Sequence, residues 1–276
     1  MGEPPEFVAR ALDPRDHAEA REVAVRAGAH GVYVGNFLAG GGSGDGGELV
    51  GFYGVDGLVG LAFFGARGNL IVVEDRPLDG EAVATGLDHC YHPWRIALAP
   101  QPVVQALARR EVRTPLVQRE QLYYGVQPSG VDHDLLRSDV RPAHRRDYSA
   151  LLAAALDLNE TDLLVDRRRV HRPWLRESIR RRMRHGQTLL IDLDGEVACK
   201  LDIGSAGVFG TMVEGVYTVP GARGRGLAAG LVATVAHGVE AELVCLHVAA
   251  DNQAARRAYE RAGMSLRERC WLLLRA

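Results

Sequence analysis

Lysine is almost absent from this chain: Lys200 is the single lysine beside 32 arginines among the 33 basic residues. We attribute this shortage to codon bias of the genome rather than to function. Long apolar runs are missing too, since none reaches the roughly 18 residues that a membrane span needs. The N-terminus, Met1–Glu6, is acidic and precedes no signal-peptide segment. We therefore expect a soluble, cytoplasmic protein.

Metal-ligand spacing is lacking as well. The cysteines Cys90, Cys199, Cys245 and Cys270 are scattered, mostly in apolar runs, which predicts buried thiols in a reducing compartment. The run 89–92 holds two histidines and a cysteine but has no second cluster near it, so we expect no metal. A net charge of −2 and a pI near 6.6 argue against binding to nucleic acid or to an anionic membrane.

A glycine-rich turn between a strand and a helix is the most informative segment that is present. Residues 216–219 favour an extended backbone, Gly221, Gly224 and Gly226 let the chain curl, and an apolar helix begins at Leu227. Such a turn directs free N–H groups and the positive end of a helix dipole at one point. The pattern predicts a site for the phosphates of a cofactor.

The spacing within this turn separates three kinds of phosphate site. The phosphate loop of NTPases needs Lys and Ser/Thr after its last glycine, where this chain has Leu227 and Ala228. Gly224, Gly226 and Gly230 are one residue out of register for a dinucleotide fingerprint. Residues 223–228 read Arg-x-x-Gly-x-Ala. This resembles the acyl-CoA signature Gln/Arg-x-x-Gly-x-Gly/Ala of the GCN5-related N-acetyltransferases.

A second motif follows at the distance that this family shows. Residues 243–248 form a β-type run, and 251–264 look like a helix with Asp251 or Asn252 at the N-cap and Gly263 after its end. The family helix commonly reads Asn-x-x-Ala-x-x-x-Tyr-x-x-x-Gly-Phe. Four residues match, with Met264 in place of Phe: Asn252, Ala255, Tyr259 and Gly263.

The resemblance implies a fold and a set of cofactor contacts. The fold is α/β (α+β), a mixed, largely antiparallel sheet flanked by helices, with middle strands that splay to admit the cofactor. Amides around 217–219 are implied to bind the acyl carbonyl and pantetheine, and amides of 223–229 the pyrophosphate. The implied cofactor-binding residues are Tyr217, Thr218, Val219, Arg223, Gly224, Arg225, Gly226, Leu227, Ala228, Ala229 and Asn252.

Catalysis needs an acid for the departing thiolate and a base for the attacking amine. By resemblance Tyr259 is the acid, because a phenol keeps its proton at neutral pH; the alternative is that it only packs beneath the sheet. Glu214 is the implied base, with His247 as the alternative, and each of them has a purely structural alternative. Three residues fall in a loop that is expected to face the substrate: Asn159, Glu160 and Asp162. They either attract a cationic amine or belong to a solvated loop without such a role. The candidate substrate contacts are Asn159, Glu160 and His247.

The chain divides at a linker-like stretch, 126–134, between halves with similar beginnings, 10–17 and 141–148. We interpret them as tandem copies of one module, 1–128 and 136–276; a chance match is the alternative. In the first copy we expect strands at 49–53, 58–64 and 69–73 and helices at 82–87 and 103–108. The third strand runs into 74–79, which has acids and no glycines. We therefore expect a degenerate first copy, and we interpret the glycine run 40–47 as a surface loop.

In the second copy we expect helices at 148–156 and 172–184, with Trp174, Leu175, Ile179 and Met183 of the latter facing inward. Strands are expected at 188–193 and 196–203, joined by a hairpin at Asp194-Gly195, and at 210–219. The nine arginines between 167 and 184 are interpreted as a solvated face rather than as a clamp for an acidic ligand.

These features together predict a two-domain member of the family of bacterial type, an acyltransferase for groups other than amino-acyl groups. We expect acetyl-CoA, or another acyl-CoA, as the cofactor, and direct attack of a primary amine on the thioester. The acceptor is a small-molecule amine or a protein or peptide amine, and the enzyme is a monomer or homodimer. The alternative is a CoA-binding regulatory module without turnover.

Overall fold

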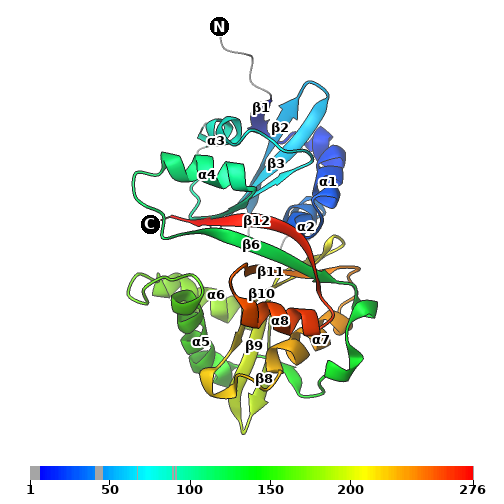
Figure 1. Cartoon of the computed structure of the whole chain (residues 1–276), viewed down its shortest axis with the longest axis vertical. Helices are drawn as coiled ribbons and strands as arrows, with labels where there is room; N and C mark the ends of the chain where they lie inside the picture. The colour runs from blue at the N-terminus through cyan, green and yellow to red at the C-terminus, as the bar shows by residue number, and fades with distance from the viewer. Residues whose placement is uncertain (1–6, 41–45, 67, 89, 91, 276) are drawn as a thin grey trace. The chain divides into compact units, whose positions relative to one another are not determined.

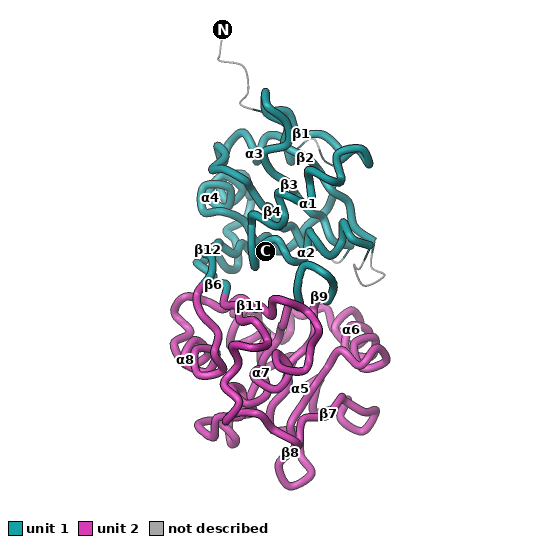
Figure 2. Tube along the Cα trace, turned by 90° about the vertical axis from the view of Figure 1, so that its right-hand side faces the viewer, with its two compact units in different colours: residues 1–123, 205–210, 267–276 teal, residues 124–204, 211–266 magenta. Residues whose placement is uncertain are grey.

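The computed structural model describes residues 7–40, 46–66, 68–88, 90 and 92–275, so most of the 40–47 run and two residues of the 89–92 run lie outside the described part. Two compact units are present (Figure 2). Unit 1 consists of Met1–Tyr123, Ser205–Gly210 and Arg267–Ala276, and unit 2 of Tyr124–Gly204 and Thr211–Leu266. The ranges expected from the sequence were 1–128 and 136–276. In the structure, the last segment of the second range, Arg267–Ala276, belongs to unit 1.

The order of elements repeats along the chain, apart from short 3₁₀ turns. The first half runs β1 (Val8–Ala11), α1 (His17–Arg26), α2 (Gly28–Leu38), β2 (Gly47–Gly54), β3 (Gly57–Gly65), β4 (Asn69–Glu74), α3 (Gly80–Asp88), β5 (Ile96–Ala99), α4 (Gln101–Arg110) and β6 (Val117–Val126). The second half runs β7 (Val140–Pro142), α5 (Tyr148–Thr161), α6 (Arg172–Arg184), β8 (Thr188–Leu193), β9 (Glu196–Gly207), β10 (Gly210–Thr218), α7 (Leu227–Gly238), β11 (Val244–Ala249), α8 (Gln253–Arg261) and β12 (Ser265–Leu274). Both follow β-α-α-β-β-β-α-β-α-β, as tandem copies of one module should.

The sheet of unit 1 runs β1-β2-β3-β4-β5-β12-β6. Its first four strands are antiparallel neighbours, and β4 and β5 are parallel. The last strand of the chain, β12, pairs antiparallel with β5 from Trp271↔Ala99 to Leu274↔Ile96. Unit 1 is therefore completed by residues that follow all of unit 2 in sequence.

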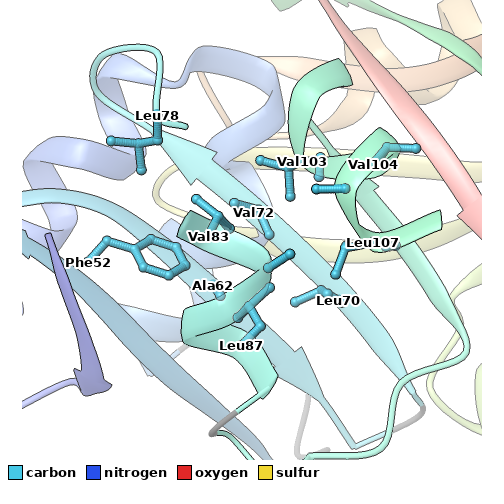
Figure 3. Close-up of a cluster of buried hydrophobic side chains, with 14 of the residues drawn as sticks. Phe52, Ala62, Leu70, Val72, Leu78, Val83, Leu87, Val103, Val104 and Leu107 are labelled. Carbon is cyan, nitrogen blue, oxygen red and sulfur yellow. The ribbon is translucent and has the colours of Figure 1, made fainter. Parts of the chain in front are cut away.

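Both faces of this sheet are buried, which explains why its strands read as nearly continuous apolar runs. On one face Leu70 and Val72 pack with α3 and α4 (Figure 3). On the other, Ile71 and Val73 pack with α1 and α2. Successive residues of β4 thus point to opposite faces, and Figure 1 shows the two helix pairs on opposite sides of the strands.

Unit 2 repeats this arrangement in the order β11-β10-β9-β8-β7. β7, β8 and β9 are antiparallel neighbours, and β10 and β11 are parallel. The hairpin at Asp194-Gly195 is confirmed, since both residues have positive φ, 53° and 82°, as a two-residue turn of this kind requires. The predicted mixed, largely antiparallel α/β fold is confirmed.

Helix α6 carries one correction. Leu175 and Ile179 are buried and Met183 packs against them, as predicted, but the Trp174 side chain is 49% exposed. The inward residues are spaced four apart, and the neighbour of Leu175 lies about 100° round the helix from that stripe. Trp174 therefore faces away from the sheet.

Three of the cysteines, Cys199, Cys245 and Cys270, are buried free thiols, and Cys90 is partly buried. No helix in the described part of the chain is both long enough and apolar enough to cross a membrane.

Candidate functional site

The two middle strands of unit 2 separate along their length. β10 and β11 are paired only at Thr211↔Val244 and Met212↔Cys245 within the described register, although β10 continues to Thr218 and β11 to Ala249. In unit 1 the equivalent pair, β4 and β5, stays in register for three of the four residues of β5. The predicted splay is therefore found in unit 2, where the two strands are not paired with one another beyond Met212 and Cys245.

The glycine-rich turn follows directly at the end of β10. Gly224 and Gly226 have φ of +77° and +75°, a backbone that residues with a side chain rarely adopt. Gly226 is the N-cap residue of α7 and, without a side chain, makes no capping hydrogen bond to it. The first N–H groups of a helix have no partner inside it and carry the positive end of its dipole. These amides can therefore donate hydrogen bonds to an anion.

Two of the amides expected to contact the cofactor are already used within the protein. The Val219 N–H donates to the Ala198 carbonyl at 3.0 Å, and the Arg223 N–H donates to the Pro220 carbonyl at 3.3 Å. The amides best placed for a phosphate are consequently those of 224–229.

Unit 1 has a different loop at the equivalent place, after β4. There the Glu74 carboxylate accepts the Leu78 N–H at 3.1 Å, and the Asp79 carboxylate accepts the Ala82 N–H at 2.8 Å. Two carboxylates of the chain itself thus take amides that a phosphate would need, and their charge would repel one.

Tyr259 lies on α8 with its ring buried. Burial raises the pKa of its phenol above the ordinary value, and the nearby Asp162 and Cys199 raise it further. Cys199 in turn contacts the hydroxyl of Thr218, at the end of β10, at 3.3 Å. The phenol of Tyr259 is therefore protonated at neutral pH.

Of the two predicted N-cap candidates of α8, Asn252 is the N-cap, and its side-chain oxygen accepts the Ala255 N–H at 3.1 Å. Gly263, with φ of +91°, follows the C-cap residue Ala262 and ends the helix as predicted. This capping is a structural role, and only the amide nitrogen of the Asn252 side chain is left for a cofactor contact.

The two candidate bases lie on neighbouring strands. Glu214 lies on β10 and His247 on β11, each two positions beyond the last paired residues, Met212 and Cys245. Burial raises the pKa of the Glu214 carboxyl to about 7, and Arg182 of α6, whose Nη2 lies 2.7 Å from its Oε2, acts in the opposite direction. Burial therefore favours the protonated form of Glu214, and the Arg182 guanidinium favours its ionised form.

Arg182 corrects the interpretation of the arginine run as one solvated face. Most of the nine are exposed, but Arg182 faces the sheet and pairs with Asp202 as well as with Glu214. The sequence held no signal for this, because α6 contains six arginines and their pattern does not distinguish Arg182 from the exposed ones.

The expected substrate-facing loop is instead helical, since α5 continues to Thr161 and includes Asn159 and Glu160. The Asn159 amide donates to the Ala155 carbonyl at 2.8 Å, a local bond that is compatible with the helix. Glu160 pairs with Arg167 at 2.5 Å, and Arg167 also pairs with Asp157. This acidic end of α5 thus already binds one cation of the chain itself.

No group of three or more candidate metal ligands occurs in the part of the chain that the structure describes.

Comparison with known proteins gives one match to a family model and several similar solved structures. Residues 207–272 match the family model described as FR47-like protein; this segment contains the glycine-rich turn, α7, β11 and α8. A search of curated proteins gives no significant match.

Solved structures match over nearly the whole chain. An acetyltransferase of the GNAT family from Colwellia psychrerythraea is similar with a TM-score of 0.53, 14% identity and coverage of 98% of this chain and 100% of that chain. A GCN5-related N-acetyltransferase from Sphaerobacter thermophilus is similar with a TM-score of 0.57 and 18% identity, and the match covers 99% of this chain and 97% of that chain. A Drosophila protein is similar with a TM-score of 0.65 and 12% identity, and the match covers 97% of this chain and 98% of that chain. At these identities the likeness establishes the fold, and it does so for both units.

Proposed function

We propose that this chain, which has the fold of the GCN5-related N-acetyltransferases, is an acyl-CoA-dependent N-acyltransferase with its active site in unit 2. The observation that carries the proposal is the uncapped glycine turn at the end of the strand that splays from β11. Its positive-φ glycines and helix amides fit a pyrophosphate. The exposed edges of the strands fit the extended arm of a pantetheine.

Acetyl-CoA, or another acyl-CoA, supplies the reactive thioester when bound. The cofactor contacts that we propose are Tyr217, Thr218, Val219, Arg223, Gly224, Arg225, Gly226, Leu227, Ala228, Ala229 and Asn252, with the strongest phosphate donors in 224–229. Amides at the end of β10 orient the acyl carbonyl, because they line the splayed edge.

Glu214 takes the proton of the amine that attacks. Its carboxyl is buried, and a pKa of about 7 allows it to be ionised at slightly alkaline pH and to accept a proton there. His247, on the neighbouring strand β11, is the alternative base. Both lie beside the splay, so an amine that enters from this side reaches a base and the thioester together.

Tyr259 holds the proton that the departing thiolate requires. The rise in its pKa through burial ensures that the hydroxyl is protonated when the thiolate forms. Asn159, Glu160 and His247 are the proposed substrate contacts, and an amine with a positive charge would compete with Arg167 for Glu160.

We propose that the first module, 1–128, has lost the site, because carboxylates occupy the amides after β4. The enzyme, a monomer or homodimer, then has one active site per chain, in the module 136–276. The acceptor is a primary amine of a small molecule, a peptide or a protein.

Turnover tests this proposal. The full chain is incubated with acetyl-CoA and a panel of small amines, peptides with free N-termini and lysine peptides, and release of the CoA thiol is followed. Amine-dependent thiol release supports the proposal. Tight binding of acetyl-CoA without release for any amine would instead indicate a CoA-binding regulatory module, and absence of binding would contradict both.

A further inference from the structure

The single lysine of the chain is buried beside the candidate active site. Lys200 lies on β9 with its side chain 6% exposed. Codon bias explains why the other 32 basic residues are arginine, but it does not explain why this one is not. The surroundings of the ammonium group give a physical reason.

The ammonium group lies between a carboxylate and a glycine. Lys200 Nζ lies 2.7 Å from Asp202 Oδ2, and a Cβ built on Gly215 would lie only 2.8 Å from the same Nζ. The group is thus held between a carboxylate and the backbone of β10. A guanidinium is planar and larger than an ammonium, so arginine is not equivalent to lysine at such a position. Gly215, with φ of +54°, leaves the room and directly follows Glu214.

Asp202 connects this ammonium to Arg182. The buried Asp202 carboxylate accepts from Thr188 at 2.6 Å, from Lys200 at 2.7 Å and from Arg182 Nη1 at 3.0 Å. Burial opposes the charge of Asp202, but Lys200 and Arg182 outweigh it, so the pKa of Asp202 lies below its usual value. An ionised Asp202 therefore fixes one nitrogen of the Arg182 guanidinium.

The other end of that guanidinium meets Glu214. Arg182 Nη2 lies 2.7 Å from Glu214 Oε2, so one rigid, planar group joins the two carboxylates. With Glu214 ionised, the set Lys200, Asp202, Arg182 and Glu214 has two positive and two negative charges and is neutral. The charged or titratable groups of the elements packed around Glu214 come from α6, β9, β11 and α5: Arg182, Lys200, Asp202, His247 and Asp157.

We infer that Lys200 is a positioning residue, which acts through Asp202 and Arg182 to hold the Glu214 carboxylate in place for the attacking amine. The inference rests on the proposed function, in which Glu214 takes the proton of the amine. Without Lys200, Asp202 has a single cation left, and Arg182 must neutralise two carboxylates. Without both Lys200 and Asp202, Arg182 loses the anchor that sets its direction.

The decisive variant is the double change Lys200→Met/Asp202→Asn, which removes one charge of each sign and leaves no buried charge unpaired. We expect a folded protein whose affinity for acetyl-CoA stays within about twofold of the wild type. We expect its kcat to fall by roughly 10–100-fold, because a displaced base is inefficient even when it is charged. Arg180→Met, on the exposed side of the same helix, is the matched control and should keep the wild-type kcat.

A second measurement needs neither cofactor nor amine. Glutamate carboxyl carbons are labelled with ¹³C in the full chain, and the Glu214 signal is identified by its loss in Glu214→Gln. In Lys200→Met the titration midpoint of Glu214 should rise by about one pH unit, because the remaining charges sum to −1 when it is ionised. A midpoint unchanged in the folded variant would overturn the inference, as would a folded double variant with the wild-type kcat. If Lys200→Met fails to fold, the kcat of the double variant decides.

The two experiments, kinetics and titration, also distinguish a failure of the inference from a failure of the proposed function. A wild-type chain that neither binds acetyl-CoA nor acylates an amine would refute the proposed function. The titration of Glu214 is unaffected by that result, and it would still report whether Lys200 acts on this carboxylate.

Discussion

The hydroxyl of Tyr217, in β10, donates a 2.8 Å hydrogen bond to the Asp157 carboxylate in α5. This bond ties the strand that enters the glycine turn to the helix that ends in the acidic group around Glu160. Its partner carboxylate also meets Arg167. The two residues, 60 positions apart in sequence, therefore join the proposed cofactor side of the site to its proposed amine side.

Removal of this hydroxyl should weaken unit 2. Tyr217→Phe keeps the buried ring and loses a bond to a charged acceptor, so we expect the free energy of unfolding to fall by about 1–2 kcal/mol, measured by urea denaturation. Tyr148→Phe is the control, because no described residue hydrogen-bonds to the buried Tyr148 hydroxyl. An equal loss in both variants would show that the Tyr217 bond contributes nothing specific.

The activity should depend on the ionisation of Glu214. Burial raises the pKa of Glu214 to about 7, and only its ionised form accepts a proton, so kcat/KM should rise with pH through about 7 and then level off. The profile is measured with two amines of different pKa. A limb near 7 for both amines supports Glu214 as the base, whereas a limb that follows the pKa of the amine would assign it to the substrate.

Tyr259→Phe tests the acid. The ring still packs, but the proton donor is lost, so kcat should fall by roughly 10²–10⁴-fold with little change in affinity for acetyl-CoA. Tyr124→Phe is the control: its ring centroid lies 6.4 Å from that of Tyr259, and its hydroxyl donates to Glu260. A Tyr259→Phe enzyme with full kcat and raised KM would make Tyr259 a binding residue only.

The last strand should be essential to unit 1. Leu273 is fully buried in the cluster that contains Phe52 and Val83, so Leu273→Ala should lower the free energy of unfolding by about 2–5 kcal/mol. Leu266→Ala, in the same strand but 43% exposed, should cost little. A fragment that ends at Gly125 lacks this strand altogether, and we expect it to be unstable. Thermal unfolding of both variants and of the fragment checks these expectations.

Patterns local in the sequence predicted most of the central elements. The hairpin at Asp194-Gly195 and both ends of α8 followed from turn and capping residues, whose effect depends on their immediate neighbours. Strands β2, β3 and β4 of the first half followed from their apolar runs. α1 and α2 were not predicted, because α2 is apolar and glycine-rich and gives no clear helical stripe.

Features that depend on tertiary contacts could not be predicted from the sequence. The pairing of β12 with β5 joins residues more than 170 positions apart, and no local pattern specifies it. Lys200 was noticed only as a compositional oddity, and Arg182 was taken for one of many surface arginines. Their role depends on Asp202 and Glu214 lying within 3.0 Å of their nitrogen atoms, which only the folded chain shows.

Calorimetric titration of the full chain with acetyl-CoA tests the central claim most directly. We predict one binding site per chain, lost in Gly226→Asp, because a side chain and a negative charge then stand at the positive-φ start of α7. Gly221→Asp is the matched control: it adds the same charge to the same turn, in open space and without a positive φ, and should bind far better than Gly226→Asp. Two sites per chain, or wild-type affinity in a folded Gly226→Asp variant, would contradict the assignment of the cofactor site to this turn.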